Sequence, residues 1–140
     1  MRLNLIRQLS YLAGAWQGDG FVVHFTAPTY SMMFGSMQVS DGAGGTAYWE
    51  TYRFEEKNGA LLLYPGQMGR ESGSYVLKKP ASERPEPPFE HAFDAFINAH
   101  PAIRQIVFAS DEPGVKLAMK VRVQSPEGPA EKVFHMGRSG

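Results

Sequence analysis

The sequence has no cysteine among its 140 residues. This absence excludes disulfides, thiolate nucleophiles and thiolate-ligated zinc or iron–sulfur sites. The chain also lacks an excess of charge, because 14 Lys and Arg are balanced by 14 Asp and Glu. We therefore expect no nucleic-acid partner, since such proteins carry a basic footprint. No run reaches the roughly 18 apolar residues of a membrane-spanning helix. The length predicts a single domain over residues 1–140.

The amino-terminal segment indicates a cytoplasmic location. Residues 1–6 begin like a signal peptide, but Arg7 and Gln8 interrupt the apolar stretch that a signal peptide needs. A leader removed from the printed chain would instead make the protein an exported one. The sequence leaves open whether the protein is a homodimer.

The spacing of apolar residues predicts one short helix followed by strands. Ile6, Leu9 and Leu12 recur every three residues before Gly14, which is typical of one or two helical turns closed by glycine. Apolar and polar residues then alternate, as they do in strands. Strands are predicted at residues 21–25, 31–39, 47–56, 61–64, 73–77, 89–96, 103–109, 116–124 and 132–136. Residues 79–88, charged and rich in proline, are predicted to form a surface loop.

The turns between these segments favour an antiparallel barrel. Asn58-Gly59 is the strongest hairpin signal, because both residues tolerate the positive φ of a two-residue turn. Short strands at intervals of roughly 8–12 residues are typical of a sandwich or a barrel. A closed barrel removes exposed edges. With about eight strands, its interior is either filled or holds one small ligand.

Glu50 is the most informative polar residue. It shares one face of its strand with Tyr48 and Tyr52, and this face is the more apolar of the two. An inward carboxylate is costly unless it is paired, and such sites tend to be functional. The alternative is that this face points outward, with Trp49 and Thr51 inside.

His91 is a second polar candidate. It lies between Phe89 and Phe93 on one face, which predicts a side chain inside the barrel beside Glu50. A carboxylate there would raise the histidine pKa and would allow acid–base chemistry. The alternative is a hydrogen-bonded core histidine or one at the wet rim. The four histidines lack the spacing of metal ligands, and we expect no metal site.

The segment from Leu9 to Gly20, LSYLAGAWQGDG, resembles the opening of calycin-type barrels such as lipocalins and nitrobindins. In that superfamily a short helix leads into a Gly-x-Trp-x-Gly-x-Gly strand. The resemblance implies that Trp16 seals one barrel end beneath the ligand cavity. Other segments are similar to one subgroup of uncharacterised bacterial barrel proteins, namely residues 27–28 with 33–35, 50–59, 96–108 and 134–138.

Nitrobindins bind haem through a histidine on the last strand. His135 lies on the last predicted strand and is the one corresponding position. Against this, Phe134 and Met136 are apolar neighbours whose side chains would point into the barrel. Because side chains alternate along a strand, His135 would then point outward. We therefore expect no cofactor, and haem is the alternative.

The sequence as a whole predicts an all-β protein, a single antiparallel up-and-down calycin-like β-barrel of about 8–10 strands with a short N-terminal helix. We expect it to bind a small, partly apolar molecule in its interior. Trp16 would form the floor of that cavity, Tyr48 and Tyr52 its lining, and Glu50 and His91 its polar anchors. We assign no catalytic residues. The alternatives are a nitrobindin-like haem protein and a hydrolase or isomerase that uses Glu50 and His91.

Overall fold

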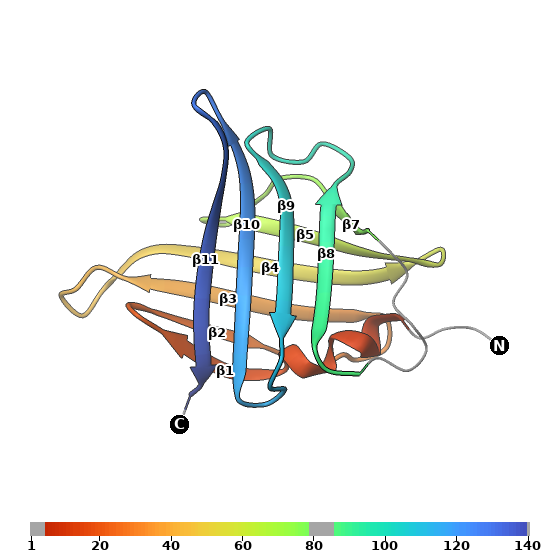
Figure 1. Ribbon diagram of the computed structural model, residues 1–140, viewed down its shortest axis with the longest axis horizontal. Helices are drawn as coiled ribbons and strands as arrows, with labels where there is room; N and C mark the ends of the chain where they lie inside the picture. The colour runs from red at the N-terminus through yellow and green to blue at the C-terminus, as the bar shows by residue number, and fades with distance from the viewer. Residues whose placement is uncertain (1–4, 79–85, 140) are drawn as a thin grey trace.

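The structure is a computed structural model that describes residues 5–78 and 86–139 (Figure 1). It begins with a short 3-10 helix, η1 (Leu5–Leu12), and continues as a series of β-strands. The strands are β1 (Gly14–Gly18), β2 (Phe21–Phe25), β3 (Met32–Ser40), β4 (Thr46–Lys57), β5 (Ala60–Gln67), β6 (Arg70–Glu71), β7 (Tyr75–Leu77), β8 (Phe89–Ala95), β9 (Ile103–Ser110), β10 (Lys116–Ser125) and β11 (Gly128–Arg138). No helix within the described ranges is long and apolar enough to cross a membrane.

Ten of these strands form a closed antiparallel barrel, and β6 is an extra strand beside it. Each barrel strand pairs with the barrel strands before and after it along the chain, and β5 pairs directly with β7. The pairing of β1 with β11 closes the ring. The predicted all-β up-and-down barrel with a short N-terminal helix is therefore confirmed, and closure pairs both edges of each barrel strand.

The turn between β4 and β5 forms where the sequence predicts it. Asn58 and Gly59 have φ angles of 53° and 79°, and the flanking residues Lys57 and Ala60 are cross-strand partners. Both turn residues therefore adopt the left-handed conformation that a two-residue hairpin requires.

The strand bounds follow the predicted ranges with two clear differences. The sequence did not predict β6, and β11 begins at Gly128 rather than at residue 132. Ser125 and Gly128 are cross-strand partners, so β11 starts directly after a tight turn. Most of the predicted loop at 79–88 lies outside the described residues.

A cluster of aromatic rings fills one part of the barrel interior. Its members are fully or almost fully buried, and neighbouring ring centroids lie 5.6–6.2 Å apart. Most of these contacts are edge-to-face, the arrangement that the ring quadrupoles favour. This aromatic cluster consists of Phe25, Tyr52, Phe54, Phe93 and Phe108.

Helix η1 plugs one end of the barrel, which lies at the bottom of Figure 1. Its buried apolar side chains belong to the same core as the aromatic cluster. At its start, the Ile6 amide donates a 3.0 Å hydrogen bond to the Glu56 carboxylate, which satisfies a helix N–H group that has no partner within the helix. At its end, the Leu12 carbonyl accepts a 2.8 Å hydrogen bond from the Trp16 indole N–H. The barrel therefore has a closed end with fixed polar contacts.

Trp16 is buried at this closed end, as predicted, with 1% of its surface exposed. The guanidinium of Arg138 lies over its ring, 4.1 Å from the ring centroid, and donates to the Ala13 carbonyl at 2.8 Å. Gly14 makes room for this guanidinium, because a Cβ at Gly14 would overlap the Arg138 side chain. The φ of Gly14 is also +122°, a value that residues with a side chain rarely adopt. Trp49, in contrast, is 37% exposed, as its predicted place on the wetter face requires.

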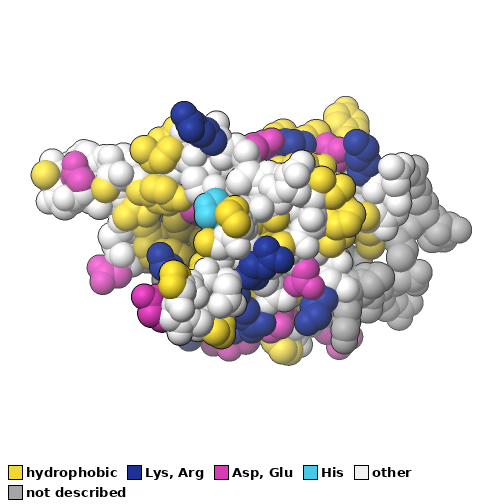
Figure 2. Space-filling model, turned by 90° about the horizontal axis from the view of Figure 1, so that it is seen from above, with side chains coloured by type: hydrophobic (Ala, Val, Ile, Leu, Met, Phe, Trp, Pro, Cys, Tyr) yellow, Lys and Arg dark blue, Asp and Glu magenta, His cyan; other side chains and the backbone are white. Residues whose placement is uncertain are grey.

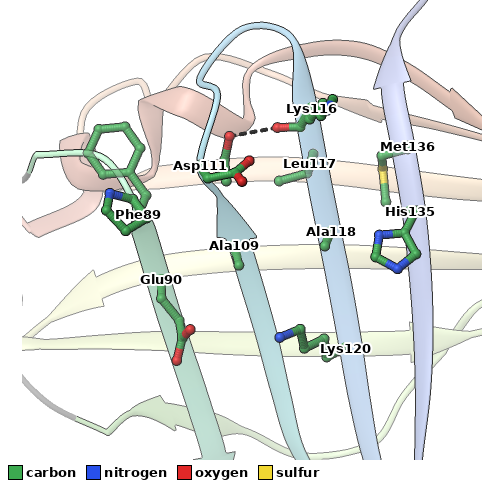
Figure 3. A pocket seen from close by; sticks show the side chains of 12 residues that line it. Phe89, Glu90, Ala109, Asp111, Lys116, Leu117, Ala118, Lys120, His135 and Met136 are labelled. Carbon is green, nitrogen blue, oxygen red and sulfur yellow. Dashed lines mark hydrogen bonds between the residues drawn. The ribbon is translucent and has the colours of Figure 1, made fainter.

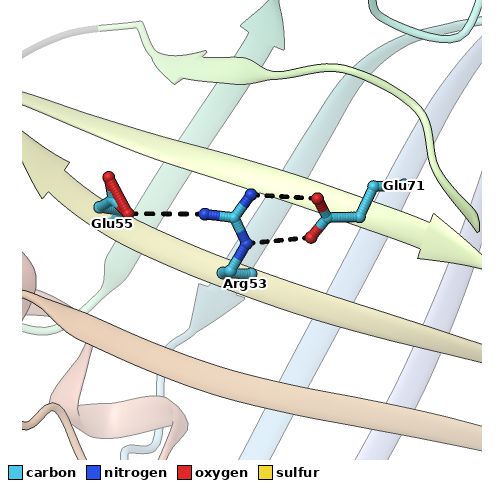
Figure 4. A network of polar contacts seen from close by, with 3 residues as sticks. All are labelled: Arg53, Glu55 and Glu71. Atoms are coloured by element: carbon cyan, nitrogen blue, oxygen red, sulfur yellow. Dashed lines mark hydrogen bonds and ion pairs between the residues drawn. The ribbon is translucent and has the colours of Figure 1, made fainter.

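The extra strand β6 is joined to the barrel by a network of charged side chains (Figure 4). Arg53 on β4 forms a bidentate pair with Glu71 on β6, with both N–O distances at 3.0 Å, and a longer contact of 3.5 Å with Glu55. Hydrogen bonds from Arg53 hold the pKa of the Glu71 carboxyl below its ordinary value. Since these side chains are partly exposed, we expect the network to stabilise the protein by only about 1 kcal/mol or less.

Candidate functional site

The barrel end opposite η1 is lined by half-buried rather than fully buried side chains. Tyr48, Val39 and Phe21 are successive cross-strand partners on β4, β3 and β2 and therefore lie on one face of the sheet. The rings of Phe21 and Phe134 meet edge-to-face at 5.6 Å. Figure 2 shows this end from above, with a hollow whose walls are largely hydrophobic and whose rim also carries a basic side chain and a histidine. We use the name barrel mouth for the half-buried residues at this end, which are Phe21, Val39, Tyr48, Glu50, Val121 and Phe134.

Glu50 is the residue of the barrel mouth that lies next to the aromatic cluster. Tyr48 donates its hydroxyl hydrogen to Oε2 of Glu50, and Tyr52 donates to Oε1, each at 2.6 Å. Such short bonds to a carboxylate are stronger than bonds between neutral groups. Tyr52 is buried and also packs against Phe25 and Phe108. One carboxylate oxygen of Glu50 is thus held by Tyr52, which is anchored in the core, and the other is held by the half-buried Tyr48.

The two tyrosines keep their protons next to this carboxylate. Burial, together with the hydrogen bond to Glu50, raises the pKa of Tyr48. Burial and the charge of Glu50 raise the pKa of Tyr52 well above its ordinary value. Both hydroxyls therefore act as donors to the carboxylate, and proton transfer from either tyrosine is disfavoured.

The residues directly beside Glu50 are neutral. Its cross-strand partners are Met37 on β3 and Gln67 on β5, and the Gln67 amide oxygen accepts a 3.2 Å hydrogen bond from Ser72. Among residues 5–78 and 86–139, none of the four ion pairs involves Glu50. A carboxylate has about four lone-pair sites, and the tyrosines use two of them. Glu50 therefore retains acceptor capacity for a further hydrogen-bond donor.

His91 does not form the predicted pair with Glu50. It is buried, and its Nδ1 lies 2.9 Å from the hydroxyl of Tyr11 on η1, which in turn donates to the Phe108 carbonyl at 3.2 Å. A neutral His91 with its hydrogen on Nδ1 satisfies both bonds. Burial lowers the pKa of His91 to about 4. The expectation of a raised pKa is therefore wrong, because desolvation acts here without a carboxylate partner.

The predicted site residues thus fall into separate groups. Tyr48, Glu50 and Tyr52 come together near the mouth, whereas His91 and Trp16 contact the η1 region. The acid–base pair that a hydrolase or isomerase would use is not formed, since each member has other partners. The role of these residues as ligand contacts stays a prediction. Sequence reasoning missed Tyr11 and Gln67, which carry no motif and are identified only by the pairing of distant segments.

His135 points to the outside of the barrel. It is exposed, whereas its neighbour Met136 is buried and takes the inward parity. A haem inside the barrel would therefore gain no ligand from His135. Within the part of the chain that the structure describes, no cluster of three His, Asp or Glu side chains is placed to hold a metal ion.

His135 instead lines a groove of about 410 Å³ on the outer wall of β8–β11 (Figure 3). Glu90, Ala109, Ala118 and His135 are successive cross-strand partners that form one row across the four strands. The two alanines make the wall shallow between the longer side chains at its ends. The sequence signal for this groove is weak, since outward-facing alanines are common on barrel walls.

Comparison of the sequence with protein-family models and with curated proteins found no match. The fold and the mouth geometry are therefore the basis for an inference about function.

Proposed function

We propose that the protein binds a small, partly apolar molecule in the barrel mouth. The observation that carries this proposal is the contrast between the two ends of the interior. One end is plugged by η1 and filled by aromatic rings, and the other leaves inward-facing apolar side chains half-buried near the Glu50 carboxylate. An apolar surface with a few fixed polar groups is the usual composition of a ligand pocket.

The arrangement of the mouth supports this function rather than a purely structural one. Phe21, Val39 and Phe134 pack against the core and are half-buried, so part of each side chain remains exposed to solvent. A ligand that covered them would remove apolar surface from water at roughly 25 cal/mol per Å². Glu50 would then orient the ligand, because it is fixed by two hydrogen bonds and needs no rearrangement to accept a third.

We further propose that the barrel belongs to the calycin-like group. The closed up-and-down topology, the N-terminal plug and the buried Trp16 support this relationship. In such barrels one end is sealed beneath the ligand cavity and the ligand occupies the interior above it. This arrangement agrees with a ligand at the mouth.

The experiment is a fluorescence titration with N-phenyl-1-naphthylamine, a neutral dye that brightens in apolar sites. We expect saturable binding by the wild-type protein. Val121→Trp adds bulk at the mouth and should weaken dye binding by about tenfold or more. The matched control is Val133→Trp on the outer wall, where Val133 is 39% exposed, and it should leave dye binding unchanged.

Two results would refute the proposal. Non-saturable dye fluorescence in the wild-type protein would show that the mouth is not a binding site. Equal weakening by both tryptophan variants would place the dye elsewhere. Circular dichroism melts of both variants show whether each still folds.

A further inference from the structure

We infer that the ligand of the barrel mouth carries a cationic nitrogen, an ammonium or amidinium group, that binds Glu50. This inference rests on the proposed function and specifies the chemical class of its ligand. The ligand is then an amine with an apolar body rather than a fatty acid or a neutral apolar molecule.

The first argument is the charge at the site. Glu50 brings a carboxylate into a half-buried position, and its immediate neighbours Met37 and Gln67 are neutral. None of the ion pairs among the described residues reaches it. A partly desolvated carboxylate without a basic partner attracts a cation strongly, because the low local dielectric weakens the screening. Lys132, the cross-strand partner of Val121, lies on the same face but is exposed and belongs to none of these ion pairs. The protein thus supplies a carboxylate at the mouth that has no ion-pair partner among the described residues.

The second argument is the direction of the hydrogen bonds. Tyr48 and Tyr52 both donate to Glu50, so neither hydroxyl hydrogen is available to an incoming acceptor. A ligand carboxylate next to Glu50 would meet a like charge and two hydroxyl oxygens whose hydrogens are already donated, with the Gln67 amide as the one neighbouring group that carries N–H donors. An ammonium group has three donors and no acceptor, and it matches both the remaining carboxylate lone pairs and the hydroxyl oxygens. The polar part of the mouth is therefore complementary to a donor that carries positive charge.

The third argument is the aromatic content of the mouth. Tyr48 and Phe21 belong to one row of cross-strand neighbours, and Phe21 contacts Phe134 at 5.6 Å. Aromatic rings attract cations through their quadrupole and also pack against apolar groups. The same side chains thus suit both ends of an amphiphilic amine, its charged nitrogen and its hydrocarbon body.

The experiment compares three compounds with one apolar body and different head groups. Octylamine, 1-octanol and octanoate are titrated against the protein loaded with N-phenyl-1-naphthylamine, at pH 7 and below micelle formation. We expect octylamine to displace the dye at a concentration roughly tenfold lower than 1-octanol, as a charge-assisted bond predicts. Octanoate should be the weakest of the three.

Glu50→Gln tests whether this preference comes from Glu50. In this variant the ratio between octanol and octylamine should fall to about one. The matched control is Glu90→Gln, which removes the same charge from the exposed outer wall of β8 and should keep the wild-type ratio. If Glu50→Gln fails to fold, the wild-type comparison of the three head groups still decides the inference.

The outcomes separate this inference from the proposed function. Saturable dye binding with equal displacement by octylamine and octanol would overturn the cationic ligand and leave the binding site in place. Stronger displacement by octanoate would overturn it as well. An amine preference that persists in Glu50→Gln would also refute it, since the cation would then bind elsewhere. Absence of dye binding would instead contradict the proposed function itself.

Discussion

The two tryptophans provide a direct test of the barrel interior. Trp16 is 1% exposed at the plugged end, whereas Trp49 is 37% exposed on the outer wall. Replacing each by alanine removes the same atoms from two very different surroundings. We expect Trp16→Ala to destabilise the protein far more than Trp49→Ala.

The structure gives the size of this difference. Truncation of a buried Trp to Ala costs about 3–5 kcal/mol, through lost transfer free energy and the cavity that remains. Trp16→Ala also removes the indole hydrogen bond to the Leu12 carbonyl, which contributes about 1 kcal/mol, and the stacked guanidinium of Arg138, which contributes roughly 0.5–1 kcal/mol. These terms partly overlap, so we expect a total of about 4–5 kcal/mol. Trp49→Ala should cost less than about 2 kcal/mol.

Urea unfolding followed by far-ultraviolet circular dichroism measures both free energies of unfolding. Each variant keeps one tryptophan, whose fluorescence provides a second probe of the same transition. Equal losses in the two variants would show that the faces of the barrel wall are wrongly assigned. A nearly neutral Trp16→Ala would show that the indole does not hold the η1 plug against the barrel.

Three further predictions concern single side chains. Burial lowers the pKa of His91 in the folded protein to about 4, whereas the same histidine in the unfolded chain binds a proton below about pH 6.5. The free energy of unfolding is therefore highest above about pH 6.5, and it falls by up to about 3 kcal/mol as the pH is lowered towards 4. His91→Gln should remove this part of the pH dependence, which urea unfolding at pH 7 and pH 4 detects as a smaller loss than in the wild type. Gly14→Ala should cost more than Gly20→Ala in the same assay, because both have positive φ but only Gly14 faces a side chain that a Cβ would displace. Tyr52→Phe should cost about 1–2 kcal/mol and Tyr48→Phe less than 1 kcal/mol, since water replaces only the partly exposed hydroxyl, and equal losses would contradict the difference in burial.

Local patterns in the sequence were sufficient to predict most of the barrel. The Asn58-Gly59 turn and the alternation along β10 depend on backbone preferences and on the two-residue period of a strand. The burial of Trp16 followed from its place in the Gly-x-Trp segment after an apolar helix. Strand β6 was missed because two residues carry no periodicity, and its place depends on the distant contact between Arg53 and Glu71.

The candidate site was only partly predictable for a related reason. The face shared by Tyr48, Glu50 and Tyr52 is a local property of one strand, and sequence parity identified it. The partner of His91 is Tyr11, 80 positions away in the chain, and no local pattern connects them. Parity alone left the direction of His135 open, and the burial of Met136 decides it. Residue pairs that depend on barrel closure are thus the ones that the sequence could not identify.

Tyr52 links the two chemically different parts of the barrel interior. Its ring contacts Phe25 and Phe108 in the aromatic cluster, and its hydroxyl holds Glu50 at the border of the mouth. Because the ring is packed in the core, its hydroxyl is held in place as well. The Glu50 carboxylate is therefore oriented before any ligand binds. Preorganisation of this kind lowers the entropic cost of binding. The filled half of the barrel therefore supports binding in the open half, because the core holds Tyr52 and Tyr52 sets the position of the Glu50 carboxylate at the mouth.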